Sequence, residues 1–251
     1  TEFYVKALSQ FQESQMDLQK ASLTSNAGRE DAATASKIVS QYMNALTHAL
    51  TIESLSVAKL NILHSMLCDS LVEDAGMLRR KNVRVGPTNF CSHDAVGDLL
   101  LNVLQSLRNL ENRLLSTNAA DRALAAVTYA AAVFMGIIDV HPYSDGNGRL
   151  ARIALNRALQ TMGVPFCIHL FATPAQRSIY SDAVRQTRRN TDLIARGSVS
   201  QEQILEVHQR TGALLPMVEL ILDRLHKAVV EFNKLIDEKS RAMSQDLEEK
   251  A

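Results

Sequence analysis

The segment 141–152, His-Pro-Tyr-Ser-Asp-Gly-Asn-Gly-Arg-Leu-Ala-Arg, combines residue types that can carry out chemistry on phosphate groups. His141 is the group here that can accept a proton near neutral pH. Asp145 offers the hard oxygen ligand that suits Mg²⁺ bridging a di- or triphosphate. Arg149 and Arg152 are one helical turn apart on nearly the same face, so both can bind phosphate oxygens. The combination predicts phosphoryl or nucleotidyl transfer.

The backbone of the same segment is predicted to bind an anion. Asp145-Gly146 and Asn147-Gly148 favour tight turns with positive φ, which by themselves would mark a plain turn. This turn joins a buried helix to the N-terminus of the next helix, expected over 149–162. Unpaired N–H groups and the helix dipole at that N-terminus attract phosphate, and glycines allow the N–H groups to turn inward as a nest.

The segment resembles the signature of the Fic family, H-P-F-x-(D/E)-G-N-G-R-x-x-R, with Tyr143 where phenylalanine is usual. Tyr143 is therefore expected to pack as the aromatic anchor of the loop, with a partner for its hydroxyl. The resemblance extends over roughly residues 22–189. Three further segments are similar to elements of the family. Leu63-His64-x-x-Leu67 resembles a core helix, and Ala75-Gly76-x-x-Arg79 with Val83-Arg-Val-Gly86 resembles the hairpin flap that pairs with the target. Arg177-x-x-Tyr180-x-x-Ala183 resembles a helix whose aromatic residue lies near adenine.

The resemblance implies a protein adenylyltransferase that moves AMP from Mg-ATP onto a Tyr, Ser or Thr hydroxyl of a target protein, and of the chain itself. It makes His141 the catalytic base and Asp145 the Mg²⁺ ligand. The residues it assigns to phosphate or ATP binding are Ser144, Gly146, Asn147, Gly148, Arg149, Arg152 and Tyr180. Those it assigns to the target-binding flap are Arg79, Asn82, Val83, Arg84 and Val85. The alternative interpretation of the Arg79-Arg80-Lys81 cluster is that it forms an ordinary solvated surface.

A regulatory segment is also implied, because many Fic enzymes carry an inhibitory helix with the motif (S/T)-x-x-x-E-(G/N). The corresponding stretch here is residues 24–30, in a protein of the N-terminal inhibitory-helix type. A motif that starts at Thr24 puts Gly28 in the glutamate position. One that starts at Ser25 puts Arg29 there, with Glu30 one residue later. Either register lacks the glutamate and predicts an unrestrained transferase, unless the stretch is simply a turn between helices.

Two other functions remain as alternatives. One is a Fic-fold enzyme that transfers UMP, phosphocholine or phosphate, although the retained Asp145 and Gly146 favour AMP. The other is a non-catalytic helical adaptor that binds nucleotide. An intact His141 argues against the adaptor, because a phosphate-binding relic has no chemical need for a base.

The elements that must position this segment are predicted to be helical. Five prolines and ten glycines in 251 residues, with Ala, Leu, Gln, Glu, Lys and Arg at helical spacing, indicate an all-α bundle, with one short hairpin around Val83-Arg-Val85 and Gly86-Pro87. Three regions are expected: an N-terminal helical region over 1–50, the Fic core over 51–190 and a helical extension over 191–251. Helices are expected over 2–21, 32–48, 52–72, 94–116, 122–138, 149–162, 173–187, 201–211 and from about 216 to 240, with a frayed end.

Composition excludes several classes of protein. Lys plus Arg balance Asp plus Glu at 27 each, so no net charge draws the chain to nucleic acid or to a membrane surface. Three cysteines without C-x-x-C spacing disfavour a disulfide scaffold or a zinc site. The apolar run 122–138 is short for a membrane span and is expected in the core. Without a visible signal peptide the expected location is cytoplasmic, and the missing initiator Met is compatible with a fragment.

The expected partners are ATP and a target protein on the flap. The last helix has two alternative roles, covering the core or forming the seam of a homodimer.

Overall fold

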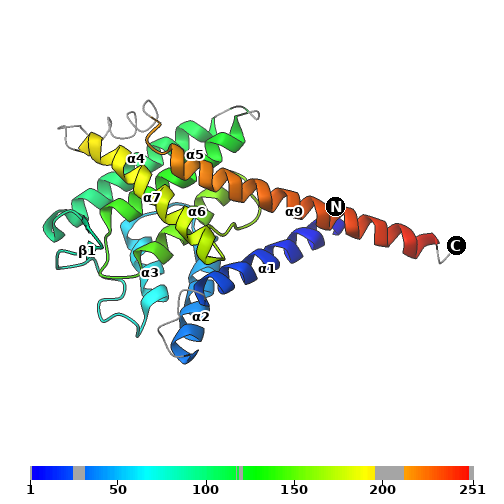
Figure 1. Cartoon of the computed structure of the whole chain (residues 1–251), viewed down its shortest axis with the longest axis horizontal. Coiled ribbons are helices and arrows are strands. Elements are labelled where there is room, and N and C mark those ends of the chain that lie inside the picture. The colour runs from blue at the N-terminus through cyan, green and yellow to red at the C-terminus, as the bar shows by residue number, and fades with distance from the viewer. Residues whose placement is uncertain (1, 25–31, 117, 119–120, 196–211, 249–251) are drawn as a thin grey trace.

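The computed structural model describes residues 2–24, 32–116, 118, 121–195 and 212–248. They form a bundle of helices with one short hairpin (Figure 1), which confirms the predicted fold class. In chain order the elements are α1 (Glu2–Thr24), α2 (Ala32–Ala49), α3 (Val57–Cys68), β1 (Arg84–Val85), β2 (Thr88–Asn89), the short 3-10 helix η1 (His93–Ala95), α4 (Val96–Leu115), α5 (Arg122–Val140), α6 (Asn147–Thr161), α7 (Pro174–Ala195) and α9 (Leu215–Glu248).

Helix α5 forms the centre of the bundle and packs against α6, α4, α9 and α7. Its small and apolar side chains, from Ala125 to Val140, are almost all buried. By length and composition α5 is the one helix among the described residues that is apolar enough to cross a membrane, but 72% of it is buried inside the fold. The sequence predicted that the apolar run 122–138 lies in the core, and the burial of α5 confirms this prediction.

Helix α6 is held on two sides by buried polar side chains. The amide of Asn156 donates to the carbonyl of Ile168 (3.1 Å) and accepts from the Ile168 N–H (2.7 Å). The guanidinium of Arg157 donates to the carbonyls of Ile52 (3.1 Å) and Glu53. These bonds fix the segments before α3 and after α6 against a helix whose N-terminus belongs to the candidate site.

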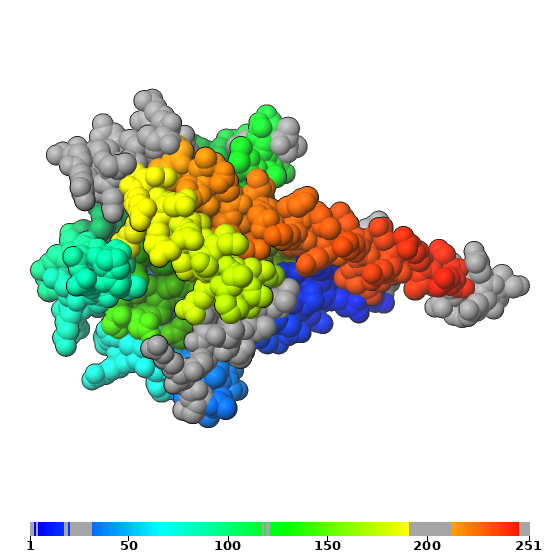
Figure 2. Space-filling model, in the orientation of Figure 1, coloured from blue at the N-terminus to red at the C-terminus, as the bar shows by residue number. Residues whose placement is uncertain are grey.

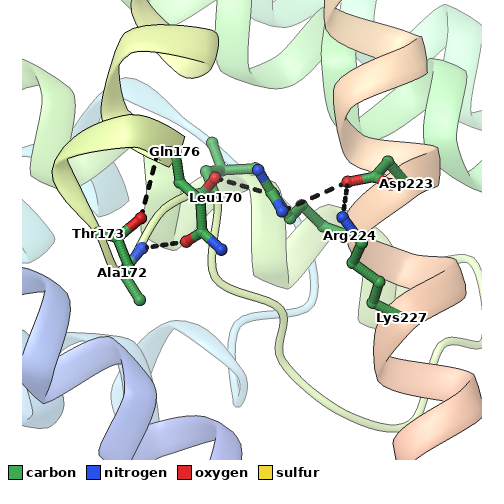
Figure 3. Close-up of polar contacts among 7 residues, drawn as sticks. All are labelled: Leu170, Ala172, Thr173, Gln176, Asp223, Arg224 and Lys227. Carbon is green, nitrogen blue, oxygen red and sulfur yellow. Dashed lines mark hydrogen bonds and ion pairs between the residues drawn. The ribbon is translucent and has the colours of Figure 1, made fainter.

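The start of α7 is tied to α9 through a set of polar contacts shown in Figure 3. Arg224, buried on α9, donates through Nε to the carbonyl of Leu170 (3.1 Å) and lies 3.3 Å from the Asp223 carboxylate. The side chain of Gln176 accepts from the N–H of Ala172 (2.7 Å), which closes the turn into α7. Because α7 supplies residues to the candidate site, this junction sets the position of one of its walls.

The molecule is elongated because α9 continues past the body of the bundle, with α1 lying beside it (Figures 1 and 2). The hairpin lies at the opposite end of the long axis from the C-terminal end of α9. The helix reaches Glu248, so the prediction of frayed residues beyond 240 was wrong.

Two other predicted boundaries also change. Helix α3 begins only at Val57, because the Ser56 hydroxyl accepts from the Lys59 N–H (3.3 Å) and caps it. Helix α6 begins at Asn147, two residues earlier than predicted, so Asn147 and Gly148 belong to its first turn. The predicted helix over 201–211 lies outside the described residues, and the division into three regions stays a prediction.

Candidate active site

His141 is the residue at which α5 ends. Its backbone adopts the left-handed conformation (φ 50°, ψ 61°), and its N–H still donates to the Ile137 carbonyl (3.0 Å). Positive φ is uncommon for a residue other than glycine and is concentrated at turns and functional sites. The left-handed residue turns the chain sharply away from α5 and starts the loop 142–146.

The imidazole of His141 is partly buried and neutral. Nδ1 lies 3.3 Å from the carbonyl of Ile138, which can only accept, so Nδ1 carries the proton and Nε2 is the acceptor. One face of the ring stacks on Phe90, with centroids 3.9 Å apart. Burial, aided by the charges of Arg188 and Arg79, lowers the pKa of His141 to about 4. The ring is therefore unprotonated at neutral pH, and Nε2 keeps its lone pair.

The loop after His141 is closed by Asn147, which is almost fully buried. Its side-chain oxygen accepts from the Tyr143 N–H (3.0 Å) and its amide nitrogen donates to the Tyr143 carbonyl (2.8 Å). The ring of Tyr143 is fully buried and its hydroxyl donates to Asn61 on α3 (2.8 Å). The predicted aromatic anchor is thus confirmed, and its hydroxyl has a protein partner.

His64 on α3 forms the floor beneath the loop. It stacks on Tyr143 with the ring planes 4° apart and the centroids 3.8 Å apart. Its Nδ1 accepts from the Gly76 N–H, so Nε2 carries the proton and donates to the Asp145 carbonyl; both distances are 2.9 Å. Burial lowers the pKa of His64, which keeps this ring neutral as well.

Gly146 and Gly148 are needed for different reasons. Gly146 has φ 76°, and a Cβ there would lie 2.6 Å from the sulfur of Cys68 and 3.1 Å from Nε2 of His64. Gly148 has ordinary helical φ, and its nearest neighbour would be Nη1 of Arg152 at 3.8 Å. The fold therefore requires glycine at 146, whereas at 148 glycine leaves open space beside the first turn of α6.

The N-terminus of α6 has two features that suit an anion. Gly146 caps the helix and supplies no side-chain hydrogen bond to the N–H groups of the first turn. Arg149 lies alongside, and its Nη1 is buried without a hydrogen-bond partner among the described residues. A buried guanidinium nitrogen left unpaired is unfavourable, and a phosphate oxygen would satisfy it.

Asp145 is the candidate metal ligand, and its side chain is 74% exposed, 3.6 Å from Nη2 of Arg149. Within the described part of the chain, no three His, Cys, Asp or Glu side chains gather as a metal site. A single exposed carboxylate beside an anion site fits Mg²⁺ that binds together with phosphates, because Mg²⁺ usually takes one or two carboxylates, water and phosphate oxygens.

Arg152 reaches a second group of residues deeper in the bundle. Its guanidinium carbon lies 5.2 Å from the centre of the Phe171 ring, and its charge and hydrogen bond act on the buried Tyr42 of α2. Burial nevertheless raises the pKa of Tyr42 to about 12, so its hydroxyl stays protonated. Tyr180 of α7 packs on Phe171 with centroids 4.8 Å apart, which brings Tyr180 into the same cluster as Arg152.

Beside the loop, β1 and β2 form an antiparallel hairpin in which Arg84 pairs with Asn89 and Val85 with Thr88. Gly86 (φ 56°) and Pro87 make the two-residue turn, as predicted. The hairpin is a separate two-stranded sheet, so each strand has one edge that no other described strand pairs.

Residues 54–159, which span α3 to α6, match the profile of the Fic/DOC family. Residues 54–159 therefore form a Fic/DOC domain.

The similar proteins agree with that assignment. A uridine 5′-monophosphate transferase of Xanthomonas campestris is 31% identical over 93 residues, which are 36% of this chain and 17% of that protein. The protein adenylyltransferase Fic of Drosophila erecta is 34% identical over 94 residues, 37% of this chain and 17% of that protein. The match therefore spans only 17% of the length of either relative.

A solved structure shares the fold of nearly the whole chain. It is a Fic-domain-containing signalling protein of Bacteroides thetaiotaomicron with a TM-score of 0.67, 15% sequence identity, and coverage of 94% of this chain and 96% of that one. The likeness therefore includes helices outside the segment that matches the family profile.

The Fic domain uses two of the predicted site residues differently from the prediction. Arg79, predicted on the flap or on a solvated surface, is only 3% exposed; it donates to the carbonyls of His141 (2.8 Å), Lys81 (3.0 Å) and Cys91 (2.7 Å). The side-chain amide of Asn147, predicted to cradle phosphates, is buried and forms two hydrogen bonds with the backbone of Tyr143. Both side chains therefore hold the loop in shape.

The other predicted residues have the following places. Val83, Arg84 and Val85 are on or next to β1, whereas the side-chain oxygen of Asn82 accepts from the His93 N–H (2.9 Å). The hydroxyl of Ser144 donates to Asp74 (2.5 Å), so it binds the loop to the segment after α3. The regulatory candidates Gly28, Arg29 and Glu30 lie outside the described residues; Thr24 is the last residue of α1.

Several residues of the Fic domain site were not assigned to it from the sequence, namely Asn61, His64, Asp74, Phe90 and Arg188. His64 was predicted on a core helix and is fully buried there, but its hydrogen bonds to the backbone of Gly76 and Asp145 were not foreseen. The one available signal was the presence of Asn61 and His64 among the apolar residues of α3, because polar groups that become buried require partners.

Proposed function

We propose that this protein transfers AMP from Mg-ATP onto a Tyr, Ser or Thr hydroxyl of a target protein. The observation that carries the proposal is the position of a neutral imidazole on the loop that leads into an uncapped helix N-terminus. Base and anion site are only five residues apart in sequence, from His141 to Gly146, and both are held by buried contacts. Nucleotidyl transfer needs a proton acceptor and a bound phosphate that are both held in a fixed orientation.

In the proposed reaction, Nε2 of His141 takes the proton of the target hydroxyl. The hydroxyl oxygen attacks the α-phosphorus, a new P–O bond forms, and the bond between the α-phosphorus and the bridging oxygen breaks to release pyrophosphate. Arg149 and Arg152 bind phosphate oxygens, and the first-turn N–H groups of α6 stabilise the charge that develops on them. Asp145 would hold the Mg²⁺, which when bound neutralises phosphate charge.

The hairpin is the proposed docking site for the target. Each strand has an unpaired edge, and an extended segment of a target can add to such an edge through backbone hydrogen bonds. Such pairing would align the hydroxyl next to the loop, because Phe90, which follows β2 directly, touches His141.

The decisive experiment compares His141→Ala with His226→Ala, a change at an exposed histidine on α9. Wild-type protein and both variants are incubated with Mg-ATP and a cell lysate, and AMP-modified peptides, including those of the chain itself, are mapped by mass spectrometry. The loss of a positioned base should lower transfer about 10²–10⁴-fold in His141→Ala. ATP affinity should stay unchanged, as should all activity of His226→Ala; equal modification by both variants contradicts the proposal.

UMP transfer is the second candidate, because the relative from Xanthomonas campestris is named a uridine 5′-monophosphate transferase. ATP and UTP supplied in parallel distinguish the two by the mass added to the peptide. Nucleotide binding with no added mass in any condition would identify an adaptor.

A further inference from the structure

Phe90 contacts the candidate base although it lies outside the loop that carries the chemistry. It is the first residue after β2, and its ring lies on the face of the His141 imidazole with centroids 3.9 Å apart and planes 25° apart. A stack of this kind covers the ring face and leaves the edge, which carries Nε2, available. His141 accordingly remains partly exposed.

The imidazole needs this support because its own bonding is weak. Among the described residues, its one polar contact is Nδ1 to the Ile138 carbonyl at 3.3 Å, longer than a good hydrogen bond. A proton acceptor must be held close to its productive orientation, and small misplacements lower rates strongly. The stack with Phe90 supplies a second restraint on the plane of the ring.

Phe90 is itself held from the other helices. The guanidinium carbon of Arg188 on α7 lies 4.3 Å from the centre of its ring, a favourable cation–π distance. Nε of Arg188 lies 3.4 Å from the carboxylate of Asp139, two residues before His141 on α5. The contacts therefore form a closed chain: Asp139 on α5 contacts Arg188 on α7, Arg188 contacts Phe90 after β2, and Phe90 contacts His141 at the end of α5.

We propose that Phe90 is a positioning residue for His141, which fixes the plane of the imidazole and links the orientation of the base to the hairpin. This inference rests on the proposed function of His141 as the base. The pairing of a target with the hairpin and the alignment of the base would then involve adjacent residues, Asn89 and Phe90. The charged groups that face His141 are Arg188, Arg79 and Asp145.

The test uses three substitutions and two measurements. Phe90→Ala removes the ring, Phe90→Leu keeps apolar bulk without a planar face, and Phe90→Tyr keeps the planar ring. The first measurement is kcat and the KM for ATP; the second is the pKa of His141 from NMR titration of its ring protons. Phe90→Ala should lower kcat about tenfold to a hundredfold, with the KM for ATP within about twofold of wild type.

The two measurements separate orientation from burial. Phe90→Ala should raise the pKa of His141 from about 4 towards its ordinary value, because burial is the main cause of the low value. Phe90→Leu should keep the pKa low and still lose kcat, and Phe90→Tyr should restore both. A purely structural role would instead lower the melting temperature and the ATP affinity together.

Two results would overturn the inference. One is a Phe90→Ala enzyme with kcat within about threefold of wild type while His141→Ala is inactive. The other is a Phe90→Leu enzyme with the kcat of wild type, because that side chain keeps apolar bulk but has no planar face to hold the imidazole. Full activity of His141→Ala would instead refute the proposed function, so the two failures are distinguishable.

Discussion

The loop 142–146 and the hairpin 84–89 lie next to each other but are held in different ways. The loop is fixed by side chains that are almost fully buried and hydrogen-bonded, above all Asn147, His64 and Arg79. The hairpin consists of two residue pairs, and Val85 is 57% exposed. Satisfied buried polar networks rigidify a structure, whereas a short exposed hairpin is only marginally stable by itself. The geometry that chemistry requires is thus built into the fold, and the surface proposed for recognition is left adaptable.

Among the variants that test this comparison, Gly146→Ala in the loop is expected to lower stability most. The new Cβ would meet the sulfur of Cys68 at 2.6 Å, at a residue with φ 76°. Strain and overpacking together should lower the free energy of unfolding by about 2–4 kcal/mol, measured by denaturant titration.

Gly148→Ala is the matched control. Its Cβ has ordinary contacts, so the free energy of unfolding should stay equal or rise by about 0.5–1 kcal/mol through helix propensity. Nucleotide binding should nevertheless weaken, because the methyl group occupies the space beside the anion site. Equal stability of the two variants would show that the loop is not rigid at Gly146.

The different roles of Gly146 and Gly148 could not be predicted from the sequence, because they depend on contacts with distant residues. The order of helices, the hairpin at Gly86-Pro87 and the role of Tyr143 as an anchor were predictable, because they depend on periodicity, turn chemistry and a long motif. The roles of Arg79 and Asn147 were not. Both residue types suit phosphate binding, and only the three-dimensional structure shows that these two side chains are buried and donate to backbone carbonyls.

Boundaries that depend on single caps were likewise difficult to predict. The apolar run 52–72 continues beyond both ends of α3, and the Ser56 cap decides where the helix begins. Contacts between distant segments, such as Phe90 with His141, leave no periodic signal in the sequence.

Acid should destabilise the folded protein through the two histidines that contact the loop. His141 and His64 both have a pKa below the ordinary value, so the unfolded chain binds protons that the folded protein does not. Their contribution to the free energy of unfolding should be fully present above about pH 6.5, the ordinary histidine value, and be lost as the pH falls towards about 4, the pKa of His141.

The melting temperature measured at several pH values between about 7 and 5, the range in which histidines titrate, tests this prediction. His141→Ala should show a weaker dependence on pH, and His226→Ala should behave as wild type. A pH dependence that is identical in all three proteins would contradict a neutral, buried imidazole at the end of α5.

Tyr143→Phe should have a smaller effect. It leaves the side-chain oxygen of the partly buried Asn61 without its donor, which lowers the free energy of unfolding by about 1 kcal/mol. The double variant Asn61→Leu, Tyr143→Phe should recover most of that loss, because neither partner is then left unpaired. Additive effects in the double-mutant cycle would mean that the two side chains do not interact.

The smallest effect on stability is expected in the hairpin. Val85→Ala removes an exposed side chain and should change the free energy of unfolding by less than about 0.5 kcal/mol. If the target adds a strand here, KM for the target should change while KM for ATP does not. A loss of stability as large as that of Gly146→Ala would remove the contrast between the two regions.

The bond between Asn61 and Tyr143 also has a consequence for how this protein can evolve. A lineage with phenylalanine at position 143 needs no acceptor on α3, so an apolar residue can appear at position 61 without loss. Each change made alone passes through a less stable intermediate. The two positions are therefore expected to covary among descendants of this chain, although 82 residues separate them in sequence.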